Sequence, residues 1–288
     1  MICELPGGIL DASGRRHREA ELIAPGGREE ELLATVGARE TASLVSELLS
    51  RCVPRIGELR DFDPGALLVG DRTFLLLKLR EMTFGEQVAA VVHCPYPTCG
   101  AKVDVDFNLR DVPVRAIDSE NFRVEYSDRL EHGDEPPLDV VFRLPTGADQ
   151  AAVGPLLANN EAVALTALLA RCLVSAEDTN GAKAAEDLSP GMRVQLERRM
   201  EAVAPTVLLD FEAHCHECQR DFGLPFHLQD FFFGELRIHR DLLYREVHYL
   251  AFHYHWSESE IMDMPREKRR KYIEVLGEEI ERYNETSA

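Results

Sequence analysis

The segment QVAAVVHCPYPTCGAKVDVDF (87–107) places two cysteines, Cys94 and Cys99, in a short turn between two β-favouring runs. Two prolines stiffen this turn, and Gly100 accepts the unusual backbone angles that a tight turn often needs. The pattern predicts a β-hairpin that carries a pair of thiols at its tip.

A second pair of cysteines lies in HCHECQ (214–219), and this shorter turn also separates β-favouring runs, residues 206–211 and 222–228. Two turns with two thiols each can bring four sulfurs to one metal ion at about 2.3 Å. We therefore predict a zinc-ribbon-like module in which one Zn²⁺ is bound by Cys94, Cys99, Cys215 and Cys218.

Four protein ligands would leave no position for an activated water, which favours a structural zinc ion over a catalytic one. His93, His214 and His216 lie beside the thiols and are alternative ligands for one of the four positions. Histidines next to a metal site more often support the ligands or are simply exposed.

The two cysteine pairs could instead form disulfides, act as redox thiols or meet by coincidence. The other cysteines, Cys3, Cys52 and Cys172, are isolated in apolar or helical contexts, and a total of seven does not suggest a disulfide framework. The first residues, MICELPGGIL, lack the basic and long apolar regions of a secretory signal. We therefore expect a protein of a reducing cytoplasm, where clustered cysteines bind metal more often than they cross-link.

The chain of 288 residues is long enough for one large or two modest domains, and its 45% hydrophobic residues suffice for a core. No apolar run approaches the roughly 20 residues that span a bilayer, so no membrane association is expected. The net charge of −19 makes general attraction to nucleic acid or anionic lipid unfavourable. The basic run REKRRK (266–271) has acidic neighbours and is interpreted as a solvated helix face. We expect a protein as the binding partner.

The N-terminal part is predicted to become helical after an irregular start. Residues 1–26 are Gly-rich, and GGREEELLATVG (26–37) predicts a helix whose acidic first turn suits the helix dipole. A second helix is expected at 41–52. In VGDRTFLLLKLREMTFG (69–85), Asp71 is predicted to be the N-cap of an almost wholly buried helix that leads into the first thiol hairpin.

Between the two cysteine pairs lie 115 residues, far more than the roughly one to two dozen of a simple zinc ribbon. NFRVEYS and LDVVFRL predict two strands that are joined through the polar stretch EHGDEPP. Helices are expected at 146–174 and 190–203, the second with Ser189 as N-cap and Pro190 at the first helical position. The stretch SAEDTNGAKAAEDLS (175–189) is predicted to be a loop.

The C-terminal part is predicted to be helical after Phe231–Phe233. One apolar stripe comprises Leu243, Val247, Leu250, Ala251 and Tyr254. Ser257 and Glu260 have the spacing of a capping box, with Trp256 and Ile261 as a hydrophobic staple. A last helix at about 265–283 is expected to bury Tyr272, Leu276, Ile280 and Tyr283.

These three helices suggest a helix-turn-helix, and a zinc-ribbon transcription regulator is one alternative function. The charges argue against it, because the segment from Glu235 onward contains nine Lys and Arg but twelve Asp and Glu. A zinc-dependent enzyme is a second alternative, although the sequence contains no GxSxG, Walker A, HExxH or Rossmann glycine motif. Asp104 and Asp106 alternate on a strand and as easily form a solvated face.

The sequence thus predicts an α+β protein in which a zinc-ribbon-like β module with a long β-plus-α insertion is flanked by helical regions. The expected parts are a mainly helical region (1–85), the zinc-ribbon-like module (86–112 and 205–230), the inserted hairpin and helices (113–204) and a C-terminal helical region (231–288).

Three stretches resemble the baseplate assembly proteins of T4-like contractile phage tails, which also occur in gene clusters of phage-like contractile injection systems. They are GGREEELLA (26–34), the block from LLVGDRTF to VDFNL (67–109) and the block from LLYREV to KYIEVL (242–276). The resemblance implies a non-enzymatic role in building the hub or wedges of a baseplate, as a chaperone or as a component of the particle. It also implies other tail or baseplate proteins as partners, and it leaves the oligomeric state open. The insertion at 113–204 departs from the family pattern.

Overall fold

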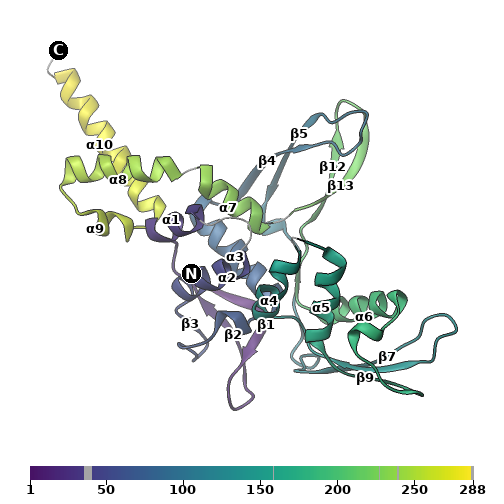
Figure 1. Cartoon of the computed structure of the whole chain (residues 1–288). Coiled ribbons are helices and arrows are strands. Elements are labelled where there is room, and N and C mark those ends of the chain that lie inside the picture. Colours follow the sequence, from purple (N-terminus) through teal and green to yellow (C-terminus); the bar gives the residue numbers. More distant parts are fainter. Residues whose placement is uncertain (36–40, 158, 227, 239, 287–288) are drawn as a thin grey trace. The chain divides into compact units, whose positions relative to one another are not determined.

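The computed structural model describes residues 1–35, 41–157, 159–226, 228–238 and 240–286 (Figure 1). The chain combines helices with small antiparallel sheets, which confirms the predicted mixture of the two. It divides into two compact units, and each is assembled from three separate segments. Unit 1 comprises Met1–Leu22, Gly37–Leu75 and Pro113–Leu208, and unit 2 comprises Ile23–Val36, Leu76–Val112 and Leu209–Ala288.

Unit 1 begins with a three-stranded sheet, so the prediction of an irregular start is wrong. Strands β1 (Ile2–Leu10) and β2 (Arg16–Glu21) form a hairpin, and β3 (Arg55–Ile56) pairs with β2. Gly7 and Gly8 resemble chain breakers in the sequence, but both lie inside β1, where the register shifts. Their backbone N–H groups donate to the buried carboxylate of Asp71, at 2.6 and 2.8 Å.

Asp71 is therefore not the predicted N-cap. Helix α3 (Val69–Phe84) begins two residues earlier, and the Asp71 carboxylate binds strand β1 instead of its own helix. The burial of the helix is confirmed, because its buried side chains include Phe74, Leu75, Leu76, Leu77 and Leu79. Helix α2 (Thr41–Cys52) also has the predicted bounds and buries Leu44, Leu48 and Leu49.

The rest of unit 1 is a four-stranded sheet with helices. The strand order is β10-β9-β8-β7, and the strands span Tyr126–Leu130 (β7), Leu138–Phe142 (β8), Leu173–Asp178 (β9) and Gly181–Ala182 (β10). Helices α5 (Glu161–Cys172) and α6 (Pro190–Val203) share one apolar core with this sheet, and α4 (Gly147–Leu157) packs against α2 and α5. Short strands β6 (Val114–Arg115) and β11 (Thr206–Val207) pair where this region begins and ends. Single 3₁₀ turns lie at Pro64–Ala66 and Ala185–Asp187 in unit 1, and another lies at Leu109–Asp111 in unit 2.

Several predictions for the insertion are confirmed, and two are wrong. The strands on either side of EHGDEPP form the expected hairpin, and Ser189 caps α6 with Pro190 in the first turn. The first strand, however, shares only Tyr126 and Ser127 with the predicted segment NFRVEYS (121–127). The single helix expected at 146–174 is instead two helices, because Asn160 caps a new helix and Leu173 already belongs to β9. The predicted loop at 175–189 contains the hairpin of β9 and β10.

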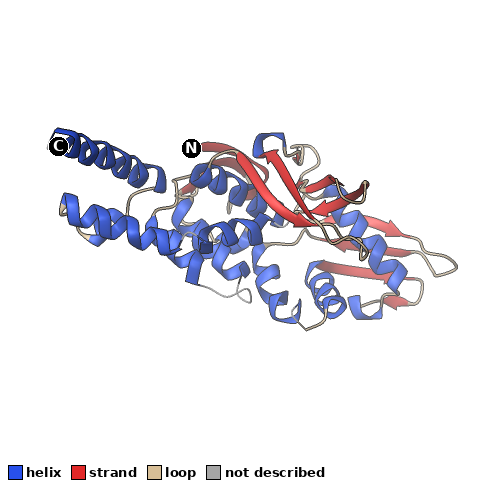
Figure 2. Cartoon of the chain, turned by 90° about the horizontal axis from the view of Figure 1, so that it is seen from above, coloured by secondary structure: helices blue, strands red, loops and turns tan. Residues whose placement is uncertain are grey.

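Unit 2 contains two β-hairpins and a set of helices. The first hairpin pairs β4 (Gln87–His93) with β5 (Lys102–Asn108), and the second pairs β12 (Asp210–Cys215) with β13 (Arg220–Pro225). Helix α1 (Gly27–Thr35) precedes them in sequence, and the last two residues of the predicted 26–37 helix lie outside the described residues. The C-terminal region is helical (Figure 2), with α7 (Leu228–Ile238), α8 (Arg240–Tyr254), α9 (Glu258–Met262) and α10 (Arg266–Thr286).

The C-terminal helices follow the predicted pattern in part. Leu243 and Leu250 of α8 are buried, and Ser257 and Glu260 form the expected capping box at the start of α9. The predicted burial of Tyr283 is wrong, since this side chain is 72% exposed near the end of α10.

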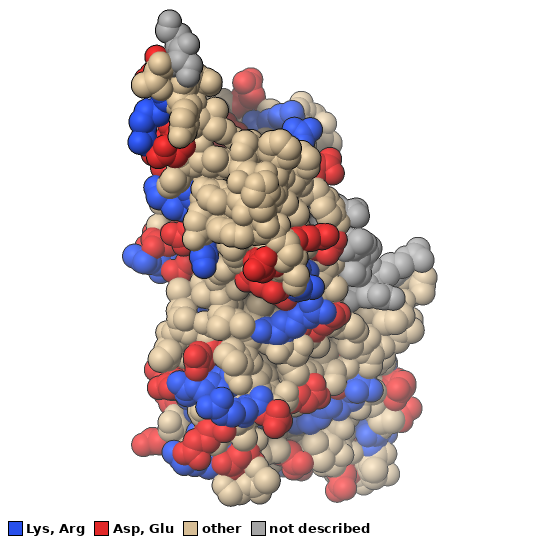
Figure 3. Space-filling model, turned by 90° about the vertical axis from the view of Figure 1, so that its left-hand side faces the viewer, with Lys and Arg blue, Asp and Glu red and all other residues tan. Residues whose placement is uncertain are grey.

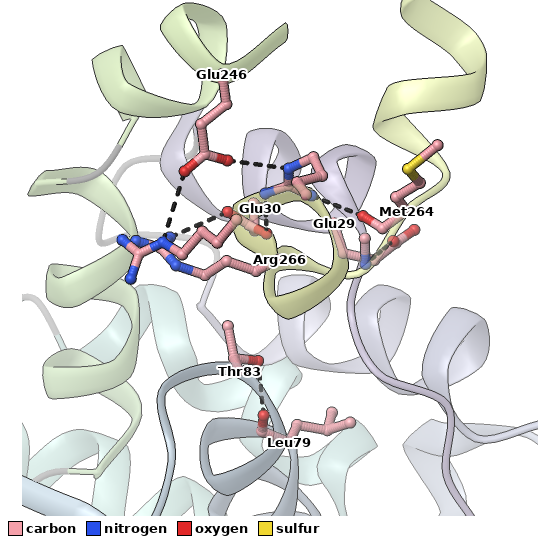
Figure 4. Close-up of polar contacts among 10 residues, drawn as sticks. Glu29, Glu30, Leu79, Thr83, Glu246, Met264 and Arg266 are labelled. Atoms are coloured by element: carbon pink, nitrogen blue, oxygen red, sulfur yellow. Dashed lines mark hydrogen bonds and ion pairs between the residues drawn. The ribbon is translucent and has the colours of Figure 1, made fainter. Parts of the chain in front are cut away.

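Buried ion pairs join α1 to α10 within unit 2. Glu30 accepts from Arg266 at 3.2 Å and from Arg269 at 2.7 Å, and Arg269 also donates to Glu246 of α8 at 3.0 Å (Figure 4). All four side chains are at most slightly exposed. The basic run that looked like a solvated helix face thus supplies two arginines to the interior.

Candidate metal centre

The tips of the two hairpins hold the four cysteines in tight turns. In the first turn, the N–H of Cys94 donates to Ala101 O and the N–H of Cys99 donates to Tyr96 O, at 2.8 and 2.9 Å. Gly100 has a φ of +62°, which explains why glycine suits this position. In the second turn, the N–H of Gln219 donates to Cys215 O at 2.8 Å.

The four sulfurs converge, and the close contacts run between the hairpins. Cys94 Sγ lies 3.7 Å from Cys218 Sγ, and Cys99 Sγ lies 3.7 Å from Cys215 Sγ. All four sulfurs lie within 4.8 Å of one another. A regular tetrahedron with zinc–sulfur bonds of 2.3 Å has edges of about 3.8 Å, whereas a disulfide requires about 2.05 Å. The donor set and its spacing therefore fit a tetrahedral thiolate metal site.

The sulfurs lie in a small apolar cluster formed by both hairpins. Cys94 and Cys215 are buried and the other two cysteines are half-buried, with Val103, Ala213 and Phe222 as the buried apolar neighbours. Such a lining excludes water and strengthens electrostatic interactions at the sulfurs.

Further contacts beside the cluster join the hairpins. The hydroxyl of Tyr96 donates to the backbone oxygen of Asp221 at 2.9 Å, and the guanidinium of Arg220 lies 4.9 Å from the Tyr96 ring. The sequence analysis missed these residues. The sequence shows that Tyr96 lies inside the first thiol turn and that Arg220 directly follows the second. It does not show that these two residues, which are 124 positions apart, meet in the fold.

The environment of the thiols differs from one sulfur to the next. The backbone N–H groups of Cys218 and Glu217 lower the pKa of Cys215 to about 7, which favours the thiolate near neutral pH. Burial and the neighbouring thiols raise the pKa of Cys218 to about 12. A bound cation would favour the thiolate at every position.

The three histidines near the cysteines lie outside the sulfur cluster. His93, His214 and His216 are exposed, and His214 Nδ1 is 2.7 Å from Asp221 Oδ1, a contact that raises the pKa of His214. Within the described residues, the group of side chains suited to a metal ion consists of the four cysteines alone. Cys52 and Cys172 are buried elsewhere, and burial raises the pKa of Cys172 to about 11. Both therefore fit the predicted role of small apolar residues, whereas Cys3 is half-buried.

Comparison with known families adds evidence from most of the chain. The family model described as "T4 bacteriophage base plate protein" matches residues 24–233. The chain belongs to this family. The match confirms the resemblance to T4-like baseplate proteins and includes the first two of the three stretches that suggested it, whereas the third (242–276) lies outside the match. The match also spans both thiol turns and residues 113–204, which we had expected to depart from the family pattern.

Membership of the baseplate family suggests a structural protein that interacts with other baseplate or tail proteins. A second family model, described as a family of unknown function, matches residues 236–288 of this baseplate family member. No curated protein and no solved structure matches the chain. Among the helices of the described residues, none combines the length and apolar character that crossing a bilayer requires.

Proposed function

We propose that this chain is a non-enzymatic assembly factor or structural component of the baseplate of a contractile tail or phage-like injection system. We further propose that Cys94, Cys99, Cys215 and Cys218 bind one structural Zn²⁺ that joins its two hairpins. The observation that carries the proposal is the convergence of four thiols from distant segments of a chain that matches the baseplate family.

The geometry of the cluster supports a structural ion. Four cysteines fill the coordination sphere of zinc, so no open position remains for a substrate or an activated water. Zinc would also reinforce the Tyr96–Asp221 hydrogen bond in joining the two hairpins, which form separate two-stranded sheets. Because the entropy of loop closure grows only with the logarithm of loop length, the stabilisation would come mainly from metal binding itself.

The composition of the surface supports a role in protein assembly. A net charge of −19 opposes binding to nucleic acid and to the anionic bilayer surface. The same charge limits self-association and would help to select partners with basic surfaces. The protein would act in the cytoplasm, where tails are assembled, whether or not it stays in the particle.

The first test is the zinc content of the purified full-length chain, measured by elemental analysis, with thermal melting before and after a strong chelator. We expect about one zinc ion per chain and a lower melting temperature after chelation. A chain without zinc whose melting is unchanged by the chelator would contradict the metal assignment.

A matched pair of variants connects the metal to assembly. Cys215→Ser should lose zinc, melt at a lower temperature and fail to co-purify with co-expressed baseplate and tail proteins. Cys3→Ser makes the same chemical change outside the cluster and should keep zinc and co-purification. If both variants retain co-purification while Cys215→Ser lacks zinc, the metal is not needed for assembly. If the wild-type chain binds none of the baseplate and tail proteins, the assembly role itself is wrong.

A further inference from the structure

Helix α10 carries an apolar stripe along most of its length. Ile273, Leu276, Ile280 and Tyr283 follow one another at intervals of three, four and three residues, which places them on one side of the helix. The first three are half-buried, and Tyr283 is 72% exposed. Such a stripe is normally covered by a packed neighbour.

The first turns of α10 make several contacts that fix it in unit 2. Arg266 and Arg269 pair with buried glutamates, and the ring of Tyr272 packs on Tyr254 and Trp256 at centroid distances of 5.6 and 4.8 Å. Tyr254 is the last residue of α8. The 14 residues of α10 that follow Tyr272, residues 273–286, extend for about 21 Å at 1.5 Å per residue. In Figure 1 this part of α10 rises above α8 toward the C-terminus.

The spacing of the stripe is that of a coiled coil. Ile273 and Ile280 occupy equivalent positions one heptad apart, and Leu276 lies between them at the second core position. In parallel coiled coils, Ile at the first core position with Leu at the second favours two strands. The stripe therefore fits one additional helix, in the parallel arrangement to which this preference applies.

The charges beside the stripe select the kind of helix. From Ile273 to Thr286 there are five glutamates and one arginine. Glu279 directly precedes Ile280 and flanks the core of such a coiled coil, whereas the other four glutamates lie at outer positions of the same acidic segment. A second copy of α10 would bring two acidic segments together, which like-charge repulsion opposes. A helix with lysines or arginines beside its apolar stripe is complementary.

We propose that residues 273–286 are a docking surface for one basic amphipathic helix of another protein, which packs parallel to α10 as a two-stranded coiled coil. These residues lie within a separate family match over residues 236–288, outside the match to the baseplate family. Phe252 of α8 is a further apolar side chain and is 68% exposed. Figure 3 shows a broad area without Lys, Arg, Asp or Glu just below the C-terminal turns of α10. The docking surface contains no cysteine and does not depend on the metal.

The test uses two fluorescently labelled synthetic peptides of three heptads with identical Ile and Leu core positions. One peptide carries lysine at the flanking positions and the other carries glutamate. Each is titrated with the full chain and followed by fluorescence anisotropy at low and high salt. We expect binding of the lysine peptide that weakens at high salt, and at least tenfold weaker binding of the glutamate peptide.

Two variants of α10 locate the binding surface. Ile280→Asp should lower the affinity for the lysine peptide at least tenfold, because it removes an apolar core contact. Val275→Asp adds the same acid on α10 off the stripe, and it should leave the affinity within about twofold, a difference of about 0.4 kcal/mol. Circular dichroism and melting would check that both variants remain folded. Equal binding of the two peptides, no binding of the lysine peptide, or equal effects of the two variants would overturn the proposal.

Sedimentation of the chain without peptide tests whether a second copy of the chain occupies the stripe. A monomer is the expected result. A dimer that Ile280→Asp dissociates would assign the stripe to a second copy and would also overturn the proposal. The titration and the sedimentation need no other tail protein, so their outcome is distinct from that of the assembly test.

Discussion

Asp71 and Asp149 show how differently two buried carboxylates of unit 1 are held. Asp149 accepts two hydrogen bonds from Arg143, at 2.6 and 2.9 Å, and another from Arg171. Burial acts to raise its pKa, but the contacts with Arg143 and Thr146 outweigh burial and hold the pKa well below the usual range. For Asp71, burial prevails over the two N–H groups of Gly7 and Gly8 and raises the pKa to about 6.

The raised pKa of Asp71 predicts a stability that falls with pH. Between about pH 4 and 6, the unfolded chain releases the Asp71 proton while the folded chain keeps it, so rising pH favours unfolding. Relative to Asp71→Asn, the wild type should lose up to about 3 kcal/mol of unfolding free energy across this window and change little above it. Urea denaturation of both chains at a series of pH values measures the difference. If the wild type instead gains unfolding free energy relative to Asp71→Asn as the pH rises, the folded state prefers the charged carboxylate.

At the scale of elements, the sequence predicted those whose signals are local. Ser189 with Pro190 marks the start of α6, Ser257 with Glu260 marks α9, and the thiol turns mark both hairpins of unit 2. The candidate site was predictable for the same reason, because each half of it is a short motif. The binding of zinc by these cysteines was inferred from residue type and spacing, and it stays a prediction.

The missed elements depend on distant residues. Strand β1 contains Pro6, Gly7 and Gly8, which locally read as a turn, and its glycines are held by Asp71 from another part of the chain. Strand β9 is polar at Glu177 and Asp178, and its pairing with β8 compensates for a weak strand propensity. The exposed end of α10 was mispredicted because an apolar pattern alone does not reveal whether a neighbour covers it.

The ion pairs of Glu30 predict how strongly α1 and α10 depend on each other. Glu30→Gln would leave Arg266 and Arg269 buried without their shared carboxylate, and such losses cost about 3–5 kcal/mol. We expect a lower melting temperature and faster hydrogen exchange in α9 and α10. The control is Asp263→Asn, which removes the exposed Arg28–Asp263 pair between α1 and the end of α9. Exposed pairs contribute little, so the control should resemble the wild type. Equal effects of the two variants would contradict the importance of the buried network.

At the scale of the whole molecule, the four cysteines all belong to unit 2, although most of unit 1 lies between their two pairs in the sequence. The sulfur cluster therefore lies where the segments of unit 2 that the insertion separates come together. Unit 1 has a core of its own, built around β7, β8, β9, α5 and α6.

This division predicts two different responses to metal removal. After chelation, hydrogen exchange should accelerate in β4, β5, β12 and β13, while the amides of β8 and α6 in unit 1 stay protected. Exchange followed by mass spectrometry would compare the peptides from both units in one experiment. Uniform acceleration throughout the chain would show that the units do not unfold separately.

The 115 residues between Cys99 and Cys215 also set an order of events during synthesis. At 5–20 residues per second, the ribosome needs on the order of ten seconds to add the second thiol turn after the first. During that interval the first hairpin presents two cysteines whose partners, Cys215 and Cys218, have not yet been synthesised. Most of unit 1 is synthesised before these partners. A nascent chain that stops inside the insertion consequently exposes an unpaired thiol turn, a mark by which the cell's proteolytic surveillance could tell it from a finished copy.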